Sequence, residues 1–489
     1  MKRGEKKFKK IFWEKWWLIL GLIVFLLRIP SLFEPFVYGD EGIYLTLGQA
    51  IRRGLVLYKD IHDNKPPLLY LLAAAAGNFS YYRAILFFWS FATIYLFCKL
   101  SLLLFKNKNS QIISTFIFAI LTSIHTFEGN VGNAENFMIL PTLAGFYLLL
   151  KAEKWQHYFF AGVLFSLATL FKVPASFDFA AALIFTLILF LNKKAKKYSS
   201  FIIHDSLLIF GFLLPILVTF VYYASKNALS FYLSAAFFQN LPYLSSWTPD
   251  KTKVASLPLP LILRAFFLGG ILVFIFLYRK KLSLTTTLIL TWFPFSLFAA
   301  LLSSRPYPHY LLQVLPSLAF SWGLPISKSK EKIIPIIFSI ILIFSFFWFK
   351  FWYYPNIFYY KNFYQFIVGQ KTKEEYVNYF GSQTKFLYQT ASYLKTHTTP
   401  EQKIFLWSNQ PSIYALANRL PATRLIVAYH IIDFNGWEET INTLRQNPPP
   451  YIVVSREEKR PFKELLFFLQ DYYFPTFKFG EFTIFKIKK

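Results

Sequence analysis

By composition, the 489-residue chain belongs in a lipid bilayer. Hydrophobic residues make up 55% of it, charged residues only 16%, and the mean hydropathy of +0.40 is too high for an ordinary soluble protein. The formal net charge of +27 does not indicate a nucleic-acid partner, because the basic residues occur in short clusters between apolar runs. The single cysteine, Cys98, lies inside a predicted span and excludes an internal disulfide and a cysteine-based metal finger.

The first predicted membrane span covers residues 16–33. The preceding "MKRGEKKFKK" is strongly basic, as expected of a cytoplasmic flank. A cleaved signal peptide is disfavoured, because no small-residue cleavage site follows the apolar run. We therefore expect a multi-pass protein of the cytoplasmic (inner) membrane with its N-terminus in the cytoplasm.

Further apolar runs along the chain predict about eleven crossings in total. The additional spans are expected near residues 82–105, 111–127, 136–150, 157–172, 175–191, 201–224, 259–278, 283–302, 309–326 and 333–352. If the N-terminus is inside, the loops predicted to be cytoplasmic are all basic; they contain Lys106 and Lys108, Lys151 and Lys154, and residues 192–197, 279–281 and 327–332. An odd number of spans places the C-terminus outside.

The segment 353–489 has a different texture from the apolar part. Helix-like stretches such as "KFLYQTASYLK" and "PSIYALANR" alternate with strand-like runs such as "KIFLW" and "YIVV". These patterns predict a small extracytoplasmic α/β domain over residues 353–489. Residues 1–352 are predicted to form an all-α polytopic membrane domain, with a first outer loop at 34–82.

The first outer loop carries two helical patterns. Apolar residues recur at helical spacing, followed by two arginines and a glycine that suits a helix end: Ile43, Leu47, Ala50, Ile51, Arg52, Arg53 and Gly54. This pattern predicts a short helix along the membrane surface. The second half, "NKPPLLYLLAAAAG" from Asn64, is too short to cross and is expected to dip into the interface.

Two adjacent carboxylates, Asp40 and Glu41, begin the first of these helices. For Asp40 alone, a helix N-cap is a sufficient explanation. The predicted topology, however, collects further ionisable residues at the same outer ends: Glu128, Glu135, Lys172, Asp178, Arg305 and His309. Each of the cations could cap a helix or snorkel, but unpaired charges at a hydrocarbon boundary cost several kcal/mol. Together these residues indicate a site where a base meets an anionic group.

With these residues in place, the sequence resembles the polytopic GT-C glycosyltransferases. The resemblance is to the group of dolichyl-phosphate-mannose-protein mannosyltransferases and lipid A aminoarabinose transferases. It spans roughly residues 15–330 and is carried, in chain order, by "YGDEGIYLTLGQAIRRG", "DIHDNKPPLLYLL", "GNAENFMILPTL", "FKVPASFDF" and "RPYPHYLLQVLPSLAF". It implies a GT-C-like fold with an outer C-terminal domain. It also implies transfer of a sugar from a polyprenyl-phosphate donor, reached through the membrane lipids, to an extracytoplasmic acceptor.

The resemblance also suggests roles for particular residues. Asp40, with Glu41 beside it, forms the expected catalytic pair, and Asp40 acts as general base in an inverting transfer. Residues expected to position donor or acceptor are Glu135, Tyr58 and Asp178, and those expected to bind the phosphate are Lys65, Lys172, Arg305, His309 and Tyr310.

Several alternatives stay open at the level of sequence. No cofactor is firmly implied, and a divalent cation would find only Asp40, Glu41 and Glu135 as obvious oxygen ligands. The acceptor is a lipid, a glycan or a protein, although the first loop lacks the tryptophans common in protein mannosyltransferases. The rival function is a transporter or flippase of lipid-linked sugars, disfavoured because the ionisable residues lie at helix ends rather than at the bilayer midplane. His397 and His430 are interpreted as isolated surface or structural residues.

Overall fold

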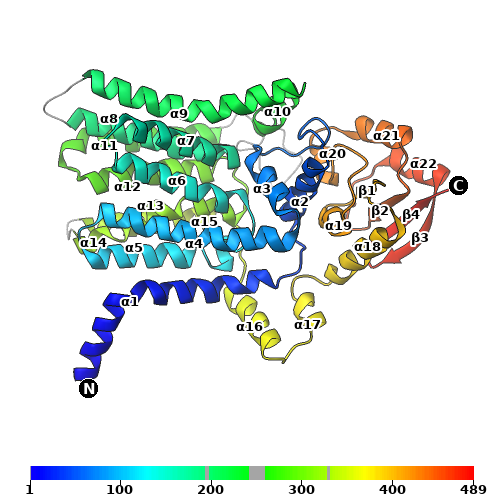
Figure 1. Cartoon of the computed structure of the whole chain (residues 1–489), viewed down its shortest axis with the longest axis horizontal. Coiled ribbons are helices and arrows are strands. Elements are labelled where there is room, and N and C mark those ends of the chain that lie inside the picture. Colours follow the sequence, from blue (N-terminus) through cyan, green and yellow to red (C-terminus); the bar gives the residue numbers. More distant parts are fainter. Residues whose placement is uncertain (1, 193–197, 242–258, 328–330, 489) are drawn as a thin grey trace. The chain divides into compact units, whose positions relative to one another are not determined.

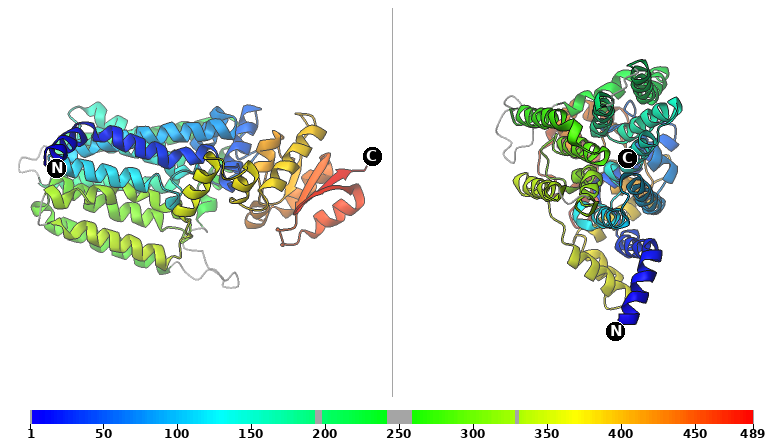
Figure 2. Two further views of the ribbon diagram at one scale, coloured as in Figure 1. Left: turned by 90° about the horizontal axis from the view of Figure 1, so that it is seen from below. Right: turned by 90° about the vertical axis from the view of Figure 1, so that its left-hand side faces the viewer.

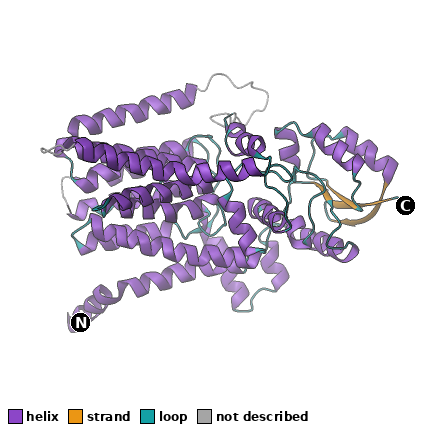
Figure 3. Ribbon diagram, turned by 45° about the horizontal axis from the view of Figure 1, so that its top comes forward, coloured by secondary structure: helices purple, strands orange, loops and turns teal. Residues whose placement is uncertain are grey.

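The computed structural model describes residues 2–192, 198–241, 259–327 and 331–488. Its contacts divide the chain into two compact units. The helical unit contains Met1–Ser31, Leu86–Val221 and Asn240–Asn356, and the mixed unit contains Leu32–Ile85, Tyr222–Gln239 and Ile357–Lys489. The first outer loop thus belongs to the same compact unit as most of the C-terminal segment. Figure 3 shows that the described strands all lie in the mixed unit.

The helical unit is a bundle of apolar helices, seen from the side in Figure 1 and end-on in the right panel of Figure 2. Its elements are α1 (Lys2–Arg28), η1 (Ile29–Leu32), α4 (Phe79–Leu104), α5 (Lys108–Leu121), η2 (His125–Phe127), α6 (Ala134–Leu150), α7 (Trp155–Phe171), η3 (Val173–Ala175), α8 (Ser176–Asn192), α9 (Tyr198–Ser225), α11 (Leu259–Tyr278), η5 (Arg279–Lys281), α12 (Leu284–Ala300), η6 (Pro308–Gln313), α13 (Leu315–Ser321), α14 (Leu324–Ser327) and α15 (Ile333–Trp348).

Stacked aromatic rings form much of the core of this bundle. The ring of Phe97 lies between those of Phe118 and Phe320, at centroid distances of 4.1 and 4.0 Å. The ring of Phe146 packs 4.1 Å from that of Trp292. Because lipid chains are as apolar as these rings, close van der Waals packing rather than removal from water stabilises the contacts between α4, α5, α6, α12 and α13.

Within the described residues, five helical segments are long and apolar enough to cross a membrane. They are Lys15–Leu32, Phe79–Leu104, Val173–Asn192, Ile202–Ser225 and Pro260–Lys281. Each predicted span coincides with helical structure, but helices such as α12, with 17 residues, fall short of the roughly 20 that a perpendicular crossing needs. The structure therefore confirms a mainly helical membrane protein but not the count of eleven spans. Two of the predicted cytoplasmic loops include residues 193–197 and 328–330, which lie outside the described residues.

The mixed unit combines short helices with a four-stranded sheet (Figure 1). Its elements are α2 (Gly39–Arg52), α3 (Leu68–Ala76), α10 (Leu229–Ala236), η4 (Phe238–Asn240), α16 (Asn356–Ile367), α17 (Lys373–Asn378), α18 (Thr384–His397), β1 (Phe405–Trp407), α19 (Ser412–Ala417), α20 (Ala428–Asp433), α21 (Trp437–Gln446), β2 (Tyr451–Ser455), α22 (Lys463–Tyr472), β3 (Tyr473–Phe479) and β4 (Phe482–Ile487).

The sheet has the strand order β1-β2-β4-β3. Strands β1 and β2 are parallel, with Leu406 opposite Val453, while β2 and β4 are antiparallel, with Val453 opposite Ile484. The predicted helices at α18 and α19 and the predicted strands at β1 and β2 are confirmed. The β3–β4 hairpin, which turns at Gly480 with a φ of +54°, was not predicted, although the aromatic and β-branched residues of "FTIFKI" favour a strand.

Helix α2 forms where the sequence predicts a helix, and it is packed inside the mixed unit. Residues 41–50 are all buried, because α2 packs between α3 and α19 of the same unit. Two glycines permit this close packing. A Cβ added to Gly42 would lie 2.6 Å from the backbone nitrogen of Ser412, and a Cβ added to Gly48 would lie 2.6 Å from the carbonyl carbon of Ala73. Hydropathy spacing predicts the helix but not these two backbone contacts, and the placement of α2 along the membrane surface stays a prediction.

Hydrogen bonds join the first outer loop to the C-terminal segment at several points. The backbone N–H of Phe36 donates to the Tyr388 hydroxyl at 2.8 Å, and that of His62 donates to the Arg424 carbonyl at 3.0 Å. The Gln49 amide donates to the Ala415 carbonyl at 3.1 Å. The loop is therefore a structural part of the mixed unit rather than an isolated connection.

Candidate functional site

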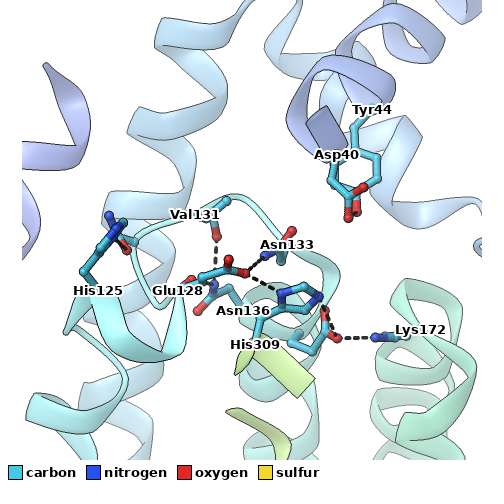
Figure 4. Close-up of polar contacts among 11 residues, drawn as sticks. Asp40, Tyr44, His125, Glu128, Val131, Asn133, Asn136, Lys172 and His309 are labelled. Carbon is cyan, nitrogen blue, oxygen red and sulfur yellow. Dashed lines mark hydrogen bonds and ion pairs between the residues drawn. The ribbon is translucent and has the colours of Figure 1, made fainter. Parts of the chain in front are cut away.

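Three predicted residues come together in the helical unit: Glu135, Lys172 and His309 (Figure 4). Glu135 lies in the first turn of α6, Lys172 follows the last residue of α7, and His309 lies in η6. Lys172 forms an ion pair with Glu135, and His309 Nε2 lies 3.8 Å from Glu135 Oε1. Helix ends that are distant in sequence thus place a lysine and a histidine against one buried carboxylate.

An aromatic ring supports the lysine of this cluster. Lys172 Nζ lies 3.8 Å from the ring centroid of Tyr310, a distance typical of a cation–π contact. The side chain of Lys172 is 15% exposed, whereas that of Glu135 is 2% exposed. Lys172 is therefore the more accessible of the two charges and the better placed to contact a ligand.

The buried carboxylate of Glu128 lies on the other side of His309 (Figure 4). Its Oε2 accepts a hydrogen bond from Asn133 Nδ2 at 3.2 Å and is paired with His309 Nδ1. The sequence pattern placed Glu128 among the outer ionisable residues but gave it no role in the site. Only the fold reveals its contact with a histidine 181 positions later in the chain.

Two other predicted residues of the helical unit have different surroundings. Asp178, in the first turn of α8, accepts hydrogen bonds from Trp292 Nε1 at 2.7 Å and Gln313 Nε2 at 2.9 Å. These bonds join α8, α12 and η6 inside the bundle, so they give Asp178 a structural role. Arg305 is half-buried in the loop that precedes η6, four residues before His309.

In the mixed unit, Asp40 lies in the first turn of α2, with Tyr38 as the helix N-cap. Asp40 is therefore not the cap itself, and its Oδ2 accepts a hydrogen bond from the Tyr44 hydroxyl at 3.0 Å (Figure 4). Lys65 Nζ lies 5.0 Å from the centroid of the same Tyr44 ring. Tyr44 thus contacts both the predicted base and a predicted phosphate-binding cation.

Lys65 also faces a carboxylate that sequence reasoning passed over. Lys65 Nζ lies 3.7 Å from Asp63 Oδ2, which accepts a hydrogen bond from the Tyr70 hydroxyl at 2.7 Å. Burial alone would raise the pKa of Asp63, but the charge of Lys65 and the Tyr70 hydrogen bond contribute to holding it below its usual value. Asp63 stands within the quoted "DIHDNKPP" motif, two residues before Lys65, and this spacing was the available signal.

His430 lies next to Asp63 and is not a surface residue. It is buried, and its Nε2 lies 3.5 Å from Asp63 Oδ1. Burial lowers the pKa of His430 to about 4, although Asp63 favours its charged form, and burial likewise lowers the pKa of His62 to about 3. At neutral pH both imidazoles are therefore uncharged, and the C-terminal segment contributes a polar group beside the Asp63–Lys65 pair.

Glu41 is fully buried and paired with Arg83. Its Oε2 accepts hydrogen bonds from Arg83 Nη2 at 2.7 Å and Nε at 3.0 Å, and Arg83 also donates to the carbonyl oxygens of Glu34 and Pro35. Sequence reasoning missed Arg83, which stands in the first turns of the span-like α4. A charged residue at that position is itself a signal that a buried partner exists.

Tyr58, predicted to position a substrate, is buried in a left-handed backbone conformation with a φ of +72°. Its hydroxyl donates to the Lys65 carbonyl at 2.7 Å, and its ring packs against those of Tyr223 and Tyr232. This residue therefore supports the backbone that carries Lys65.

The described residues contain no group of three His, Cys, Asp or Glu side chains arranged to hold a metal ion. Two of the three carboxylates that sequence reasoning offered as ligands are already paired, Glu41 with Arg83 and Glu135 with Lys172. No step of the chemistry below uses a divalent cation.

Comparison with known proteins identifies the fold. No protein-family model and no curated protein sequence matches the chain. Two crystal structures of ArnT from Cupriavidus metallidurans each superpose on this chain with a TM-score of 0.57 at 12% identity, and each alignment covers 96% of this chain. The alignment covers 97% of the ArnT structure bound to undecaprenyl phosphate and 98% of the apo structure. An oligosaccharyltransferase from Archaeoglobus fulgidus in complex with Zn and sulfate gives a TM-score of 0.44 at 14% identity, covering 90% of this chain and 67% of that one, too low a score to support an argument.

The chain thus has a GT-C glycosyltransferase fold, as the resemblance of its motifs predicts. The likeness to ArnT covers nearly the whole of both chains, including the C-terminal segment that carries the small sheet.

Proposed function

We propose that the protein is an integral-membrane glycosyltransferase that moves a sugar from a polyprenyl-phosphate donor to an acceptor on the extracytoplasmic side. The observation that carries this proposal is the Glu135–Lys172–His309 cluster at the helix ends of a GT-C fold. A partly exposed lysine that is held by a carboxylate and a ring is suited to an anionic ligand. The solved ArnT structure bound to undecaprenyl phosphate supports a lipid phosphate as that ligand.

In this proposal, the phosphate of the donor is recognised by cations and hydrogen-bond donors. The candidates in the helical unit are Lys172, Arg305, His309 and Tyr310, and Lys65 is a separate candidate in the mixed unit. Negative charge develops on the phosphate oxygen as the bond to the sugar breaks. Cations at that position stabilise the transition state more than the ground state, so they favour departure of the lipid phosphate.

Asp40 is the proposed general base. Its carboxylate takes the proton of the acceptor hydroxyl while the hydroxyl oxygen attacks the anomeric carbon, and the lipid phosphate leaves from the opposite face, which inverts that centre. Tyr44 orients the carboxylate through its hydrogen bond. Glu41 holds the first turn of α2 through Arg83, so we assign it the orientation of Asp40. Glu135 positions Lys172, and Asp178 and Tyr58 support the surrounding backbone.

The test uses the purified full chain in lipid nanodiscs with a panel of polyprenyl-phosphate sugars and lipid, glycan and peptide acceptors. Mass spectrometry of the products identifies any glycosidic bond formed. Asp40→Asn is expected to retain the fold and to lower transfer by about 10²- to 10⁴-fold, the usual value of base catalysis. Asp471→Asn, at an exposed position in α22, is the matched control and should transfer normally.

Two results would contradict the proposal. Undiminished transfer by Asp40→Asn removes this residue from the role of base. Movement of a labelled donor across the membrane of proteoliposomes, without any glycosidic product from the panel, identifies a flippase instead.

A further inference from the structure

Glu128 is a buried carboxylate that the proposed chemistry does not use. It follows η2 and has left-handed backbone angles, a φ of 52° and a ψ of 33°. This conformation costs a residue with a side chain roughly 1–2 kcal/mol relative to a right-handed one, and glycine adopts it more readily. The position therefore keeps a glutamate where the backbone favours glycine, which points to a role for its side chain.

The turn itself is held by backbone atoms and by Asn136. The N–H of Glu128 donates to the His125 carbonyl at 2.9 Å, and the N–H of Val131 donates to the Glu128 carbonyl at 3.1 Å. Asn136 Nδ2 donates to the carbonyls of Glu128 and Val131 at 3.0 and 2.8 Å. Within this turn the Glu128 carboxylate also accepts a hydrogen bond from Asn133 Nδ2 at 3.2 Å, and outside the turn it contacts the distant His309.

The carboxylate of Glu128 faces His309 (Figure 4). It is bonded to His309 Nδ1, while His309 Nε2 lies 3.8 Å from Glu135 Oε1. Glu128 also accepts from Asn133, and Glu135 is paired with Lys172, so each carboxylate has a second partner besides His309. His309 Nδ1 is hydrogen-bonded to Glu128, and Nε2 lies 3.8 Å from Glu135, too far for a hydrogen bond. The negative charges of the two carboxylates therefore favour the imidazolium form of His309.

These four groups balance in charge, with two carboxylates and two cations. Among the described residues, further titratable groups near the cluster are the imidazole of His125, which contacts the ring of Tyr354, and the phenols of Tyr307, Tyr310 and Tyr354, of which Tyr354 is hydrogen-bonded to Glu128. If Lys172 turned from Glu135 to an anionic ligand, a neutral histidine would leave Glu135 as a buried, unpaired charge. Removing one partner of a buried pair is strongly unfavourable. An imidazolium beside Glu135 would keep its carboxylate paired when Lys172 turns away.

We propose that Glu128 is a positioning residue for donor binding: it holds His309 as an imidazolium against Glu135, so that Lys172 can exchange Glu135 for the donor phosphate. The inference rests on the proposed function, because it concerns the same phosphate. It adds that phosphate binding weakens when His309 loses its proton. Glu128 sets the pH at which this happens.

The first test reads the protonation of His309 directly. ¹⁵N-histidine NMR of the full chain in nanodiscs distinguishes imidazolium from neutral imidazole, and His309→Asn identifies the signal. We expect His309 to be protonated at pH 7 in the native chain, and its titration midpoint to fall by at least one pH unit in Glu128→Gln. Glutamine keeps the shape and an acceptor but not the charge. Glu153→Gln, on an exposed turn of the same unit, should leave the midpoint unchanged.

The second test measures binding of undecaprenyl phosphate to the same proteins at pH 6 and pH 8. Glu128→Gln should bind at least tenfold more weakly than the native chain at pH 8, and the difference should shrink at pH 6, where His309 is reprotonated. A purely structural role would weaken binding equally at both pH values.

The outcomes separate the two proposals. A neutral His309 in the native chain at pH 7, or equal midpoints in the native chain and Glu128→Gln, overturns the role of Glu128 and leaves the proposed function intact. Failure of the native chain to bind undecaprenyl phosphate at either pH overturns the donor proposal and this inference together.

Discussion

Removing Arg83 is the most direct test of how the first turn of α2 is held. Arg83→Gln removes the cation that is ion-paired with the fully buried carboxylate of Glu41. The same change removes the donors to the carbonyl oxygens of Glu34 and Pro35, at 2.8 and 3.3 Å. Because Asp40 precedes Glu41 directly, the turn that carries the proposed base depends on this arginine.

The expected loss follows from the burial of the pair. Removing one partner of a buried ion pair costs about 3–5 kcal/mol, since the remaining charge stays desolvated. At 1.4 kcal/mol for each factor of ten, this is roughly a 10²- to 4 × 10³-fold increase in the local opening of α2. Arg53→Gln, at the exposed end of the same helix where Arg53 contacts Asn418, should change the opening by less than about tenfold.

Hydrogen exchange of the α2 amides, followed by mass spectrometry, measures this opening. The double variant Glu41→Gln with Arg83→Gln should be better protected than Arg83→Gln alone, because no unpaired charge remains buried. Native-like protection in Arg83→Gln would refute the reasoning. So would a double variant whose loss equals the sum of the two single losses, since the residues would then be uncoupled.

Two further predictions concern the mixed unit. The pKa of His430 is about 4 in the folded chain, compared with 6.5 in the unfolded chain. As the pH falls, the unfolded chain therefore binds the proton first, which favours unfolding. The stability of this unit should fall by about 3 kcal/mol between pH 6.5 and pH 4. Hydrogen exchange of the α20 amides measures this loss of stability, which should be smaller in His430→Gln. An equal pH dependence in the two proteins would contradict the role of His430. Gly48→Ala should destabilise α2 by about 1–3 kcal/mol in the same assay, because its Cβ would lie 2.6 Å from Ala73 and Ala74 backbone atoms. Gly270→Ala, where nothing lies within 4 Å, is the control, and equal effects of the two changes would rule out packing as the cause.

The sequence predicts those features of the fold that depend on neighbouring residues. Apolar runs indicate the helices of the bundle. A helix-like stretch indicates α18, and strand-like runs indicate β1 and β2, because hydropathy and periodicity depend only on neighbouring residues. The helix from Gly39 to Arg52 is predicted for the same reason. Its burial is not, because that depends on backbone contacts at Gly42 and Gly48 with segments far away in the chain.

The candidate site divides along the same line. Residue types and motifs single out Asp40, Lys65, Glu135, Lys172 and His309, because charges beside apolar runs need a partner or a use. Which partner each charge has is decided by packing. Glu41 pairs with Arg83, 42 positions later in the chain, and Glu128 pairs with His309, 181 positions later. Asp63 pairs with His430, 367 positions later.

The sequence by itself thus determines that this is a membrane protein with charged groups at its helix ends, since both properties depend only on the composition of short segments. The tertiary structure decides which charges neutralise one another and which stay accessible. The physical reason is that the energy of a buried charge depends on the atoms within a few ångströms of it, and those atoms come mostly from distant parts of the chain.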